Sequence, residues 1–154
     1  MRARLASQAD CILLAAMSYA LIQDEGHRNP MTVAELEQRL CGWLESGDYD
    51  AVIFERDLQP VAYALYRLEP NSDVYLRQFF VTREYRCQGI GRAAIELLFR
   101  EIWPAGTRVA VEVLAHNQVG RRFWSALGFE DYSLTLERTS TIAPRLEERR
   151  ALID

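Results

Sequence analysis

The sequence predicts an α+β fold in which helices flank a mixed, mostly antiparallel sheet. Two segments near the N-terminus repeat apolar residues at helical spacing, and β-rich runs at residues 51–54 and 61–66 flank a turn, as in an antiparallel hairpin. Farther along, a β-rich run, a helical segment and a second β-rich run follow one another. This order is that of a βαβ unit, whose crossover makes its two strands parallel.

Composition favours one acidic domain over residues 1–154, with residues 139–154 as a C-terminal tail. The chain has 154 residues and a formal net charge of -4 at pH 7, so we expect no nucleic-acid partner, whereas an acidic surface suits an amine substrate. Three cysteines without metal-ligand spacing predict reduced thiols, a cytoplasmic location and no metal site. We expect no signal peptide and no membrane span, because no apolar run reaches about 18 residues.

Two helices are expected before the hairpin. In the first, over residues 7–23, Ser7 can act as N-cap, and the apolar residues at helical spacing are Ile12, Ala15, Ala16, Tyr19 and Ile22. In the second, Thr32 can act as N-cap with Glu35 three residues on, the capping-box arrangement. Its apolar face comprises Val33, Leu36, Leu40, Trp43 and Leu44. The polar segment between the helices, residues 24–30, is expected to be an exposed loop.

The remaining elements are also read from apolar runs and turn residues. The hairpin turn is expected at residues 57–60, and a second turn at 70–73 precedes a strand over 74–81. A helix over 89–103, a strand over 109–114 and a helix over 117–127 that ends at Gly128 should follow. A last strand is expected at 132–136. Residues 144–154, rich in Glu and Arg, fit either a short helix or a solvated end.

The turn at residues 86–92 has the chemistry of a phosphate-binding site. Gly89 and Gly91 lie where a strand leads into a helix, and backbone N–H groups there lack intrahelical partners and face the positive end of the helix dipole. Arg86 and Arg92 add positive charge on either side. Two glycines are equally compatible with a purely structural turn, and the Gly-x-Gly-x-x-Gly and P-loop patterns of nucleotide sites are absent.

Two motifs in this half of the chain resemble those of the GNAT acetyltransferase superfamily. Arg86-x-x-Gly89-x-Gly91 is similar to its acetyl-CoA signature, Arg/Gln-x-x-Gly-x-Gly/Ala, and residues 117–129 are similar to its Asn-x-x-Ala-x-x-Phe-Tyr-x-x-x-Gly-Phe block. The resemblance covers residues 50–138 well. It implies acetyl-CoA as cosubstrate, and a sheet whose parallel strands before and after the motif helix splay apart to admit the acyl-pantetheine.

The resemblance also implies which residues bind the cosubstrate. Backbone groups of residues 87–92 would wrap the pyrophosphate, Phe80 and Val81 would hydrogen-bond the pantetheine as an added strand, and Asn117 and Phe123 would line the other wall. The complete expected set is Phe80, Val81, Arg86, Cys87, Gln88, Gly89, Ile90, Gly91, Arg92, Asn117, Phe123 and Trp124. Cys87 has no histidine near it in sequence, so a nucleophilic role is not expected.

Acetyl transfer to an amine requires a base, because an alkyl ammonium with a pKa of about 10 is mostly protonated at neutral pH. Glu112 is the favoured base: alternation places it opposite the valines of the strand over 109–114, where a lone carboxylate should have a raised pKa. The alternatives are that Glu112 sits at the solvated end of the strand or pairs with an arginine such as Arg77 or Arg108. The backbone N–H of Val81 is the expected partner of the thioester carbonyl oxygen.

The loop over residues 24–30 corresponds to a region that often covers the acceptor site in GNAT folds. Glu25 and His27 therefore compete with Glu112 for the role of base. The residues expected to contact the substrate are Glu25, His27, Arg28, Asn29 and Gln78. An exposed loop without a function is equally compatible with the same pattern.

Trp124 departs from the family pattern. Many members carry at this position a tyrosine that protonates the departing thiolate, and an indole N–H is not an acid at neutral pH. Three accounts stay open: the thiolate, with a pKa of about 8.5, leaves with water alone; Tyr132 or Tyr85 substitutes; or catalysis is weak.

The sequence thus predicts an acetyl-CoA-dependent N-acetyltransferase. A primary amine of a small molecule or a protein would attack acetyl-CoA directly in a ternary complex. The alternative is a non-catalytic acyl-CoA-binding sensor, which the departure at Trp124 favours. The tail and the last strand also make a homodimer an expectation.

Overall fold

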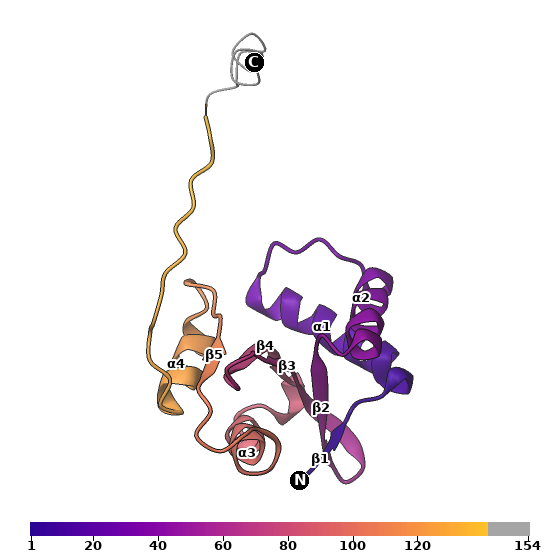
Figure 1. Cartoon of the computed structure of the whole chain (residues 1–154). Helices are drawn as coiled ribbons and strands as arrows, with labels where there is room; N and C mark the ends of the chain where they lie inside the picture. The colour runs from indigo at the N-terminus through magenta and orange to yellow at the C-terminus, as the bar shows by residue number, and fades with distance from the viewer. Residues whose placement is uncertain (142–154) are drawn as a thin grey trace.

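A five-stranded sheet forms the centre of the computed structural model, which describes residues 1–141 (Figure 1). Its strands are β1 (Arg2–Leu5), β2 (Asp50–Arg56), β3 (Gln59–Leu68), β4 (Val74–Val81) and β5 (Val109–Val111). They lie side by side in chain order; β1 to β4 are antiparallel, and β5 is parallel to β4. The predicted mixed, mostly antiparallel sheet is confirmed.

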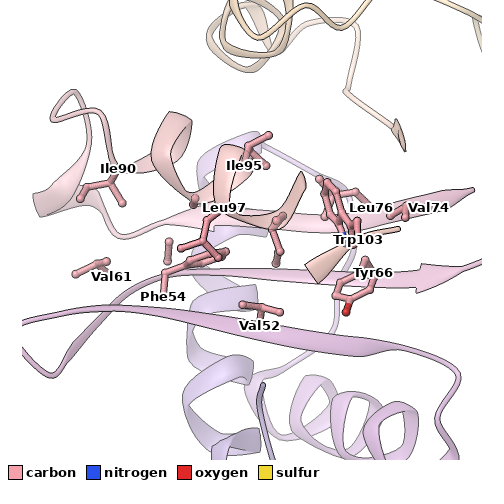
Figure 2. Close-up of a cluster of buried hydrophobic side chains, with 14 of the residues drawn as sticks. Val52, Phe54, Val61, Tyr66, Val74, Leu76, Ile90, Ile95, Leu97 and Trp103 are labelled. Atoms are coloured by element: carbon pink, nitrogen blue, oxygen red, sulfur yellow. The ribbon is translucent and has the colours of Figure 1, made fainter. Parts of the chain in front are cut away.

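Helices cover both faces of this sheet and divide the interior into two cores. Helices α1 (Cys11–Glu25) and α2 (Val33–Ser46) pack on one face, and α3 (Ile90–Leu97) and α4 (Gln118–Ala126) belong to the other (Figure 1). Figure 2 shows Ile90, Ile95 and Leu97 of α3 against the side chains of β2 to β4. The central strand β3 is buried continuously from Val61 to Tyr66, because apolar layers lie on both of its faces.

The turns and caps follow from local chemistry. Asp57 and Leu58 have φ angles of 52° and 63° and connect β2 to β3 as a two-residue hairpin turn, within the predicted turn at 57–60. Thr32 caps α2 by accepting from the Glu35 N–H, and the Glu35 carboxylate accepts from the Thr32 N–H, as in the predicted capping box. The predicted helix over 89–103 ends with a single π-helical turn over Leu98–Ile102.

Several expectations about the periphery are wrong. The strand predicted at 132–136 does not form: the chain leaves the sheet, and Tyr132 is 99% exposed (Figure 1). Strand β1 was not predicted, and β5 is shorter than the run over 109–114. In α1, Ile12 and Tyr19 of the expected apolar face are exposed; the buried residues are Cys11, Leu14, Ala15, Met17, Ser18 and Ile22. This helix is apolar around most of its circumference, so periodicity did not distinguish its faces.

The expectation of reduced thiols is wrong for Cys11 and Cys41. They form a disulfide that joins the start of α1 to α2, with Cα atoms 5.6 Å apart. Because two of the three cysteines are joined in this disulfide, the cysteine content no longer supports a cytoplasmic location. Cys87 is a free, exposed cysteine. No helix in residues 1–141 is both long and apolar enough to cross a bilayer, and the possible helix over 144–154 lies outside the described residues.

Candidate functional site

The two parallel strands, β4 and β5, are paired only at their beginnings. Leu76 pairs with Val111, and β5 ends there, whereas β4 continues for five more residues to Val81. The edge of β4 over residues 77–81 therefore lacks a strand partner on the β5 side. An unpaired strand edge can hydrogen-bond an extended amide-bearing ligand as an added strand.

The register of β4 against β3 decides which backbone groups face this opening. The Thr82 N–H donates to the Val61 carbonyl at 2.8 Å, and Ala62 is opposite Val81. Because hydrogen-bonded and non-hydrogen-bonded pairs alternate in an antiparallel ladder, the N–H and C=O groups of Val81 and Phe79 point to the β5 side. Those of Phe80 point to β3. The backbone groups on the unpaired edge are thus those of Phe79 and Val81, and the expected contact through the Phe80 backbone has no group on this edge.

The turn between β4 and α3 presents free N–H groups at a helix start. Gly89 is the N-cap with φ of 78°, and the first helical bond runs from the Ala93 N–H to the Gly89 carbonyl at 3.0 Å. The N–H groups of residues 90–92 therefore have no intrahelical partner, and the helix dipole is positive there. A Cβ on Gly89 would meet no atom within 4 Å, so the space beside this turn is open to a ligand.

Arg86 ties the turn to two other parts of the site. Its Nε donates to the Val81 carbonyl at 2.8 Å, and its Nη2 donates to the Asp24 carboxylate at 2.5 Å, where Arg83 also binds. Burial raises the pKa of Asp24, but the hydrogen bonds from Arg86 and Arg83 outweigh it, and the net pKa is lowered. The charge of Arg86, expected beside the turn, is thus paired with Asp24 in this structure.

Other basic side chains border the turn instead. Arg56, at the end of β2, donates to the Gln88 side chain at 3.3 Å, and Gln88 donates in turn to the Glu84 carbonyl at 2.9 Å. Arg92 donates to the Ala126 carbonyl at the end of α4 at 3.2 Å. Cys87 is exposed in this turn with φ of 58°. The turn thus keeps positive charge from Arg56 and Arg92 beside its free N–H groups.

Aromatic side chains of α4 form the wall beside β4. Phe123 stacks on Phe79 with ring centroids 5.8 Å apart, and a Cβ on Gly91 would lie only 2.8 Å from the Phe123 ring. Trp124 is 8% exposed and packs edge-on against Phe79, Phe123 and Phe129. Asn117 caps α4 by accepting from the Gly120 N–H at 2.9 Å. Gly91 is therefore needed for close contact between α3 and α4.

The end of α1 lies against the loop between β5 and α4. The Glu25 carbonyl and His116 Nε2, in the loop between β5 and α4, are 2.9 Å apart, so the two segments meet. Glu25 is half-buried; burial raises the pKa of its carboxyl group, the charge of Asp24 adds to this, and His116 opposes it. Since Asp24 and Val81 bind the same guanidinium of Arg86, the end of α1 lies beside the end of β4.

The other residues of the loop between α1 and α2 form hydrogen bonds within the loop or an ion pair with the C-terminal segment. His27 Nδ1 accepts from the Asn29 N–H at 3.0 Å, and the Asn29 side chain accepts from the Met31 N–H at 3.0 Å. Arg28 forms an exposed ion pair with Glu137 of the C-terminal segment. Of the predicted loop residues, only Glu25 joins the half-buried site.

Gln78 lies beneath α1 in a small polar cluster. Its Oε1 accepts from the Tyr63 hydroxyl at 2.9 Å, and its Nε2 donates to the Ser18 hydroxyl at 3.2 Å. Ser18 and Tyr63 are fully buried, and burial raises the pKa of Tyr63 above its usual range. The cluster fixes the Gln78 amide at the unpaired part of β4.

Two predicted catalytic residues are exposed. Glu112 directly follows β5, at the solvated end of that strand, so it is not the enclosed carboxylate that the alternation predicted. Tyr132 lies on the exposed segment beyond Phe129 and does not reach the site. Tyr85 packs against the core on the α3 side. Asp24, Arg56 and His116 were missed, because each contacts its partner across more than 30 residues and no local pattern marks such pairs.

The residues present fit an acyl-CoA. Free N–H groups at the start of α3 suit a pyrophosphate, and the unpaired edge at Phe79 and Val81 suits an amide-bearing arm. The open space at Gly89 admits a ligand to the turn. The described residues contain no group of three or more His, Cys, Asp or Glu side chains that could hold a metal ion.

Comparisons with known proteins agree with this geometry. Residues 15–129 match the family model described as Acetyltransferase (GNAT) family. No curated protein sequence matches the chain. Solved structures of similar fold include a possible acetyltransferase from Clostridium difficile 630, at 15% identity and a TM-score of 0.70, which covers 92% of this chain and 98% of the other.

Two further structures of similar fold contain the cosubstrate or its product. A predicted acetyltransferase from Clostridium acetobutylicum, solved with acetyl-CoA, has 19% identity and a TM-score of 0.69 over 90% of this chain and 95% of its own. Aminoglycoside N-acetyltransferase AAC(6')-Iy, in complex with CoA, has 16% identity and a TM-score of 0.70 over 92% and 95%. At these identities the likeness concerns the fold.

Gly91→Ala should weaken acetyl-CoA binding, because the new methyl group displaces the Phe123 ring that separates α3 from the β4 edge. We expect a loss of stability of about 1–3 kcal/mol from overpacking and a roughly tenfold weaker Kd, which corresponds to about 1.4 kcal/mol. Denaturant unfolding and titration calorimetry measure the two effects.

Gly42→Ala is the matched control, since Gly42 lies in α2 and a Cβ there would meet no atom within 4 Å. It should raise stability by up to about 1 kcal/mol through helix propensity alone and leave the Kd unchanged. If Gly91→Ala behaves like Gly42→Ala in both measurements, the contact between Gly91 and Phe123 does not shape the site.

Proposed function

The chain belongs to the GNAT acetyltransferase family, and on that premise we propose that it transfers an acetyl group from acetyl-CoA directly to a primary amine in a ternary complex. The observation that carries the proposal is the Val81 N–H on the unpaired edge of β4, at the strand end that Arg86 ties to the end of α1, where the half-buried carboxyl group of Glu25 lies. One group can polarise a carbonyl, and the other can accept a proton.

The proposed binding mode uses backbone groups for most contacts. The N–H groups of residues 90–92 hold the pyrophosphate, with Arg56 and Arg92 as the nearby charges. The backbone of Phe79 and the carbonyl of Val81 pair with the amide groups of the pantetheine arm, which leaves the Val81 N–H for the thioester, and Phe123 forms the opposite wall. Bound acetyl-CoA supplies a thioester whose carbonyl carbon is the electrophile.

We propose Glu25, rather than Glu112, as the residue that accepts the proton of the attacking ammonium. A base in this role must be ionised in the resting enzyme and close to the reacting centre. Glu25 is half-buried between α1 and the β5–α4 loop, and its raised pKa makes it a stronger base than an exposed carboxylate. Glu112 is exposed and has no such enclosure.

Within residues 1–141, the aromatic rings that contact Trp124 are all phenylalanines, which carry no acidic proton. Trp124 is packed among Phe79, Phe123 and Phe129, and an indole N–H does not titrate at neutral pH. We propose that the thiolate leaves unassisted by a side-chain acid, because a thiol with a pKa of about 8.5 is a tolerable leaving group. Glu25 accepts one proton of the ammonium, and the second proton, lost from nitrogen as the amide bond forms, passes through water to the thiolate released by cleavage of the C–S bond.

We also propose that the protein forms a homodimer through the segment that follows α4. Its apolar side chains alternate and are exposed in this structure: Tyr132, Leu134 and Leu136. Burial of these side chains against a second copy would remove them from water. Multi-angle light scattering should give the dimer mass, and Leu134→Glu with Leu136→Glu should give the monomer mass; a monomeric parent protein contradicts this proposal.

Glu25→Gln should lower kcat by roughly 10²–10⁴-fold, because the amide cannot accept the proton. In the parent enzyme, activity should fall as the pH drops through the raised pKa of Glu25, which lies above the usual value of about 4.3. Glu25→Gln should lack this acidic limb. Release of free CoA thiol from acetyl-CoA with a panel of primary amines, recorded against pH, measures both quantities.

Glu112→Gln is the control for charge and should retain kcat within about twofold, as surface substitutions usually do. If Glu112→Gln loses activity and Glu25→Gln keeps it, the roles are reversed and the sequence-based choice of base is correct. An enzyme that binds acetyl-CoA tightly but releases no thiol with any amine refutes the transfer and leaves an acyl-CoA sensor.

A further inference from the structure

A second charged cluster lies on the α1 and α2 side of the sheet, outside the cosubstrate site. Three guanidinium groups stack on aromatic rings there, with distances of 4.7–5.6 Å between each guanidinium carbon and a ring centroid. Stacking holds the planar guanidinium groups in place. The cluster consists of Arg39, Arg67 and Arg77 with Trp43, Tyr49 and Tyr75.

Only one of these arginines has a carboxylate partner among residues 1–141. Arg67 forms an ion pair with Glu69 at 2.9 Å. Arg39 and Arg77 each lie 4.7 Å from the ring centroid of Trp43, and no ion pair within the described residues neutralises either. Both guanidinium groups lie on the Trp43 ring and their charges repel, so an anion bound beside them would be stabilised.

Arg39 carries a hydrogen-bond donor without an acceptor. Its Nε is buried and has no partner, although a buried donor is usually satisfied. The carboxylate of Glu35, one helical turn earlier, is occupied by the Thr32 N–H at 2.8 Å. Burial lowers the pKa of Arg39, and the charge of Arg77 lowers it further, so the site as it stands is electrostatically unfavourable for its own cations.

This pair faces the acceptor side of the proposed reaction centre. Arg77 is the first residue of β4 beyond the last pair with β5, and Gln78 follows it. Gln78 accepts from Tyr63, and the hydroxyl of Tyr63 is affected by the charges of both Glu25 and Arg39. The groups therefore form one polar row from the proposed base to the unpaired arginines.

A surface hollow gives access to the same place. It has a volume of about 560 Å³ and lies beside the loop between α1 and α2; its lining residues are Pro30, Met31, Glu35, Gln38 and Arg39. A small molecule that enters here reaches Arg39 first. The hollow lies on the opposite side of the sheet from α3, so it is separate from the proposed pyrophosphate site.

We propose that Arg39 and Arg77 bind an anionic group, a carboxylate or a phosphate, on the amine that accepts the acetyl group. The inference rests on the proposed transferase function and specifies its substrate class: a primary amine that also carries a negative charge. The arginines hold the anion, Trp43 keeps their planes in position, and the amine is directed along the row toward Glu25.

Two matched pairs of amines test this proposal in the thiol-release assay. O-phosphoethanolamine is compared with ethanolamine, and 4-aminobutyrate with butylamine, so that each pair differs in the anionic group. The anionic member should have at least a roughly tenfold higher kcat/KM, as expected for a charge-assisted contact. The pair with the larger ratio identifies phosphate or carboxylate as the preferred anion.

Arg39→Gln combined with Arg77→Gln should lower kcat/KM for the anionic amines by about tenfold or more and leave the neutral amines within about twofold. Arg39→Lys with Arg77→Lys keeps the charge and should retain part of the preference, which distinguishes loss of the anion site from misfolding. Arg108→Gln is the matched control, because its side chain is 84% exposed just before β5; it should match the parent enzyme.

The outcomes separate this inference from the proposed function. Faster transfer to the neutral amines, or an equal effect of the double Gln variant on both members of a pair, overturns the anion site and leaves the transferase intact. If no amine releases thiol, calorimetry of O-phosphoethanolamine and 4-aminobutyrate with CoA-loaded protein decides. Binding that the double Gln variant abolishes supports the anion site while the transferase fails; absence of binding overturns it.

Discussion

The site depends on the hydrogen bonds made by one guanidinium group. Arg86 donates to the Val81 carbonyl and to the Asp24 carboxylate, which are 57 residues apart in the chain, and its own backbone begins the turn into α3. It thereby joins the end of β4, the end of α1 and the phosphate-binding turn. The Arg83–Asp24 ion pair and the hydrogen bond from Gln78 to Ser18 support the same arrangement, but only Arg86 binds both the strand end and the helix end.

The two faces of the sheet carry different kinds of functional group. On the α3 face, the close contact of Gly91 with Phe123 brings α3 and α4 together. The proposed contacts to the cosubstrate on this face come mostly from backbone groups. On the α1 and α2 face, side chains dominate: Glu25, the Gln78 cluster and the unpaired Arg39 and Arg77. Because β4 continues beyond the end of β5, the backbone groups of Phe79 and Val81 are unpaired on that edge, between the two faces. In the proposed reaction, the cosubstrate and the acceptor approach this edge from the two sides.

Sequence reasoning succeeded where local chemistry decides and failed where distant segments meet. The capping box at Thr32 and the left-handed Gly89 before α3 follow from a few neighbouring residues. Strand alternation misplaced Glu112, because it cannot tell where β5 ends, and it predicted a strand at Tyr132 although no neighbouring strand pairs with that segment. The role of Asp24 required knowing that α1 ends beside the turn after β4, 62 residues later.

A double-mutant cycle on Asp24 and Arg86 tests the central claim most directly. Titration calorimetry would measure acetyl-CoA binding to Asp24→Asn, Arg86→Met and the combined variant. The account predicts that each single change weakens binding and that the combined variant is no weaker than Arg86→Met alone, a coupling of about 0.5–3 kcal/mol. Binding by Arg86→Met as tight as that of the parent protein, or fully additive losses, would contradict it.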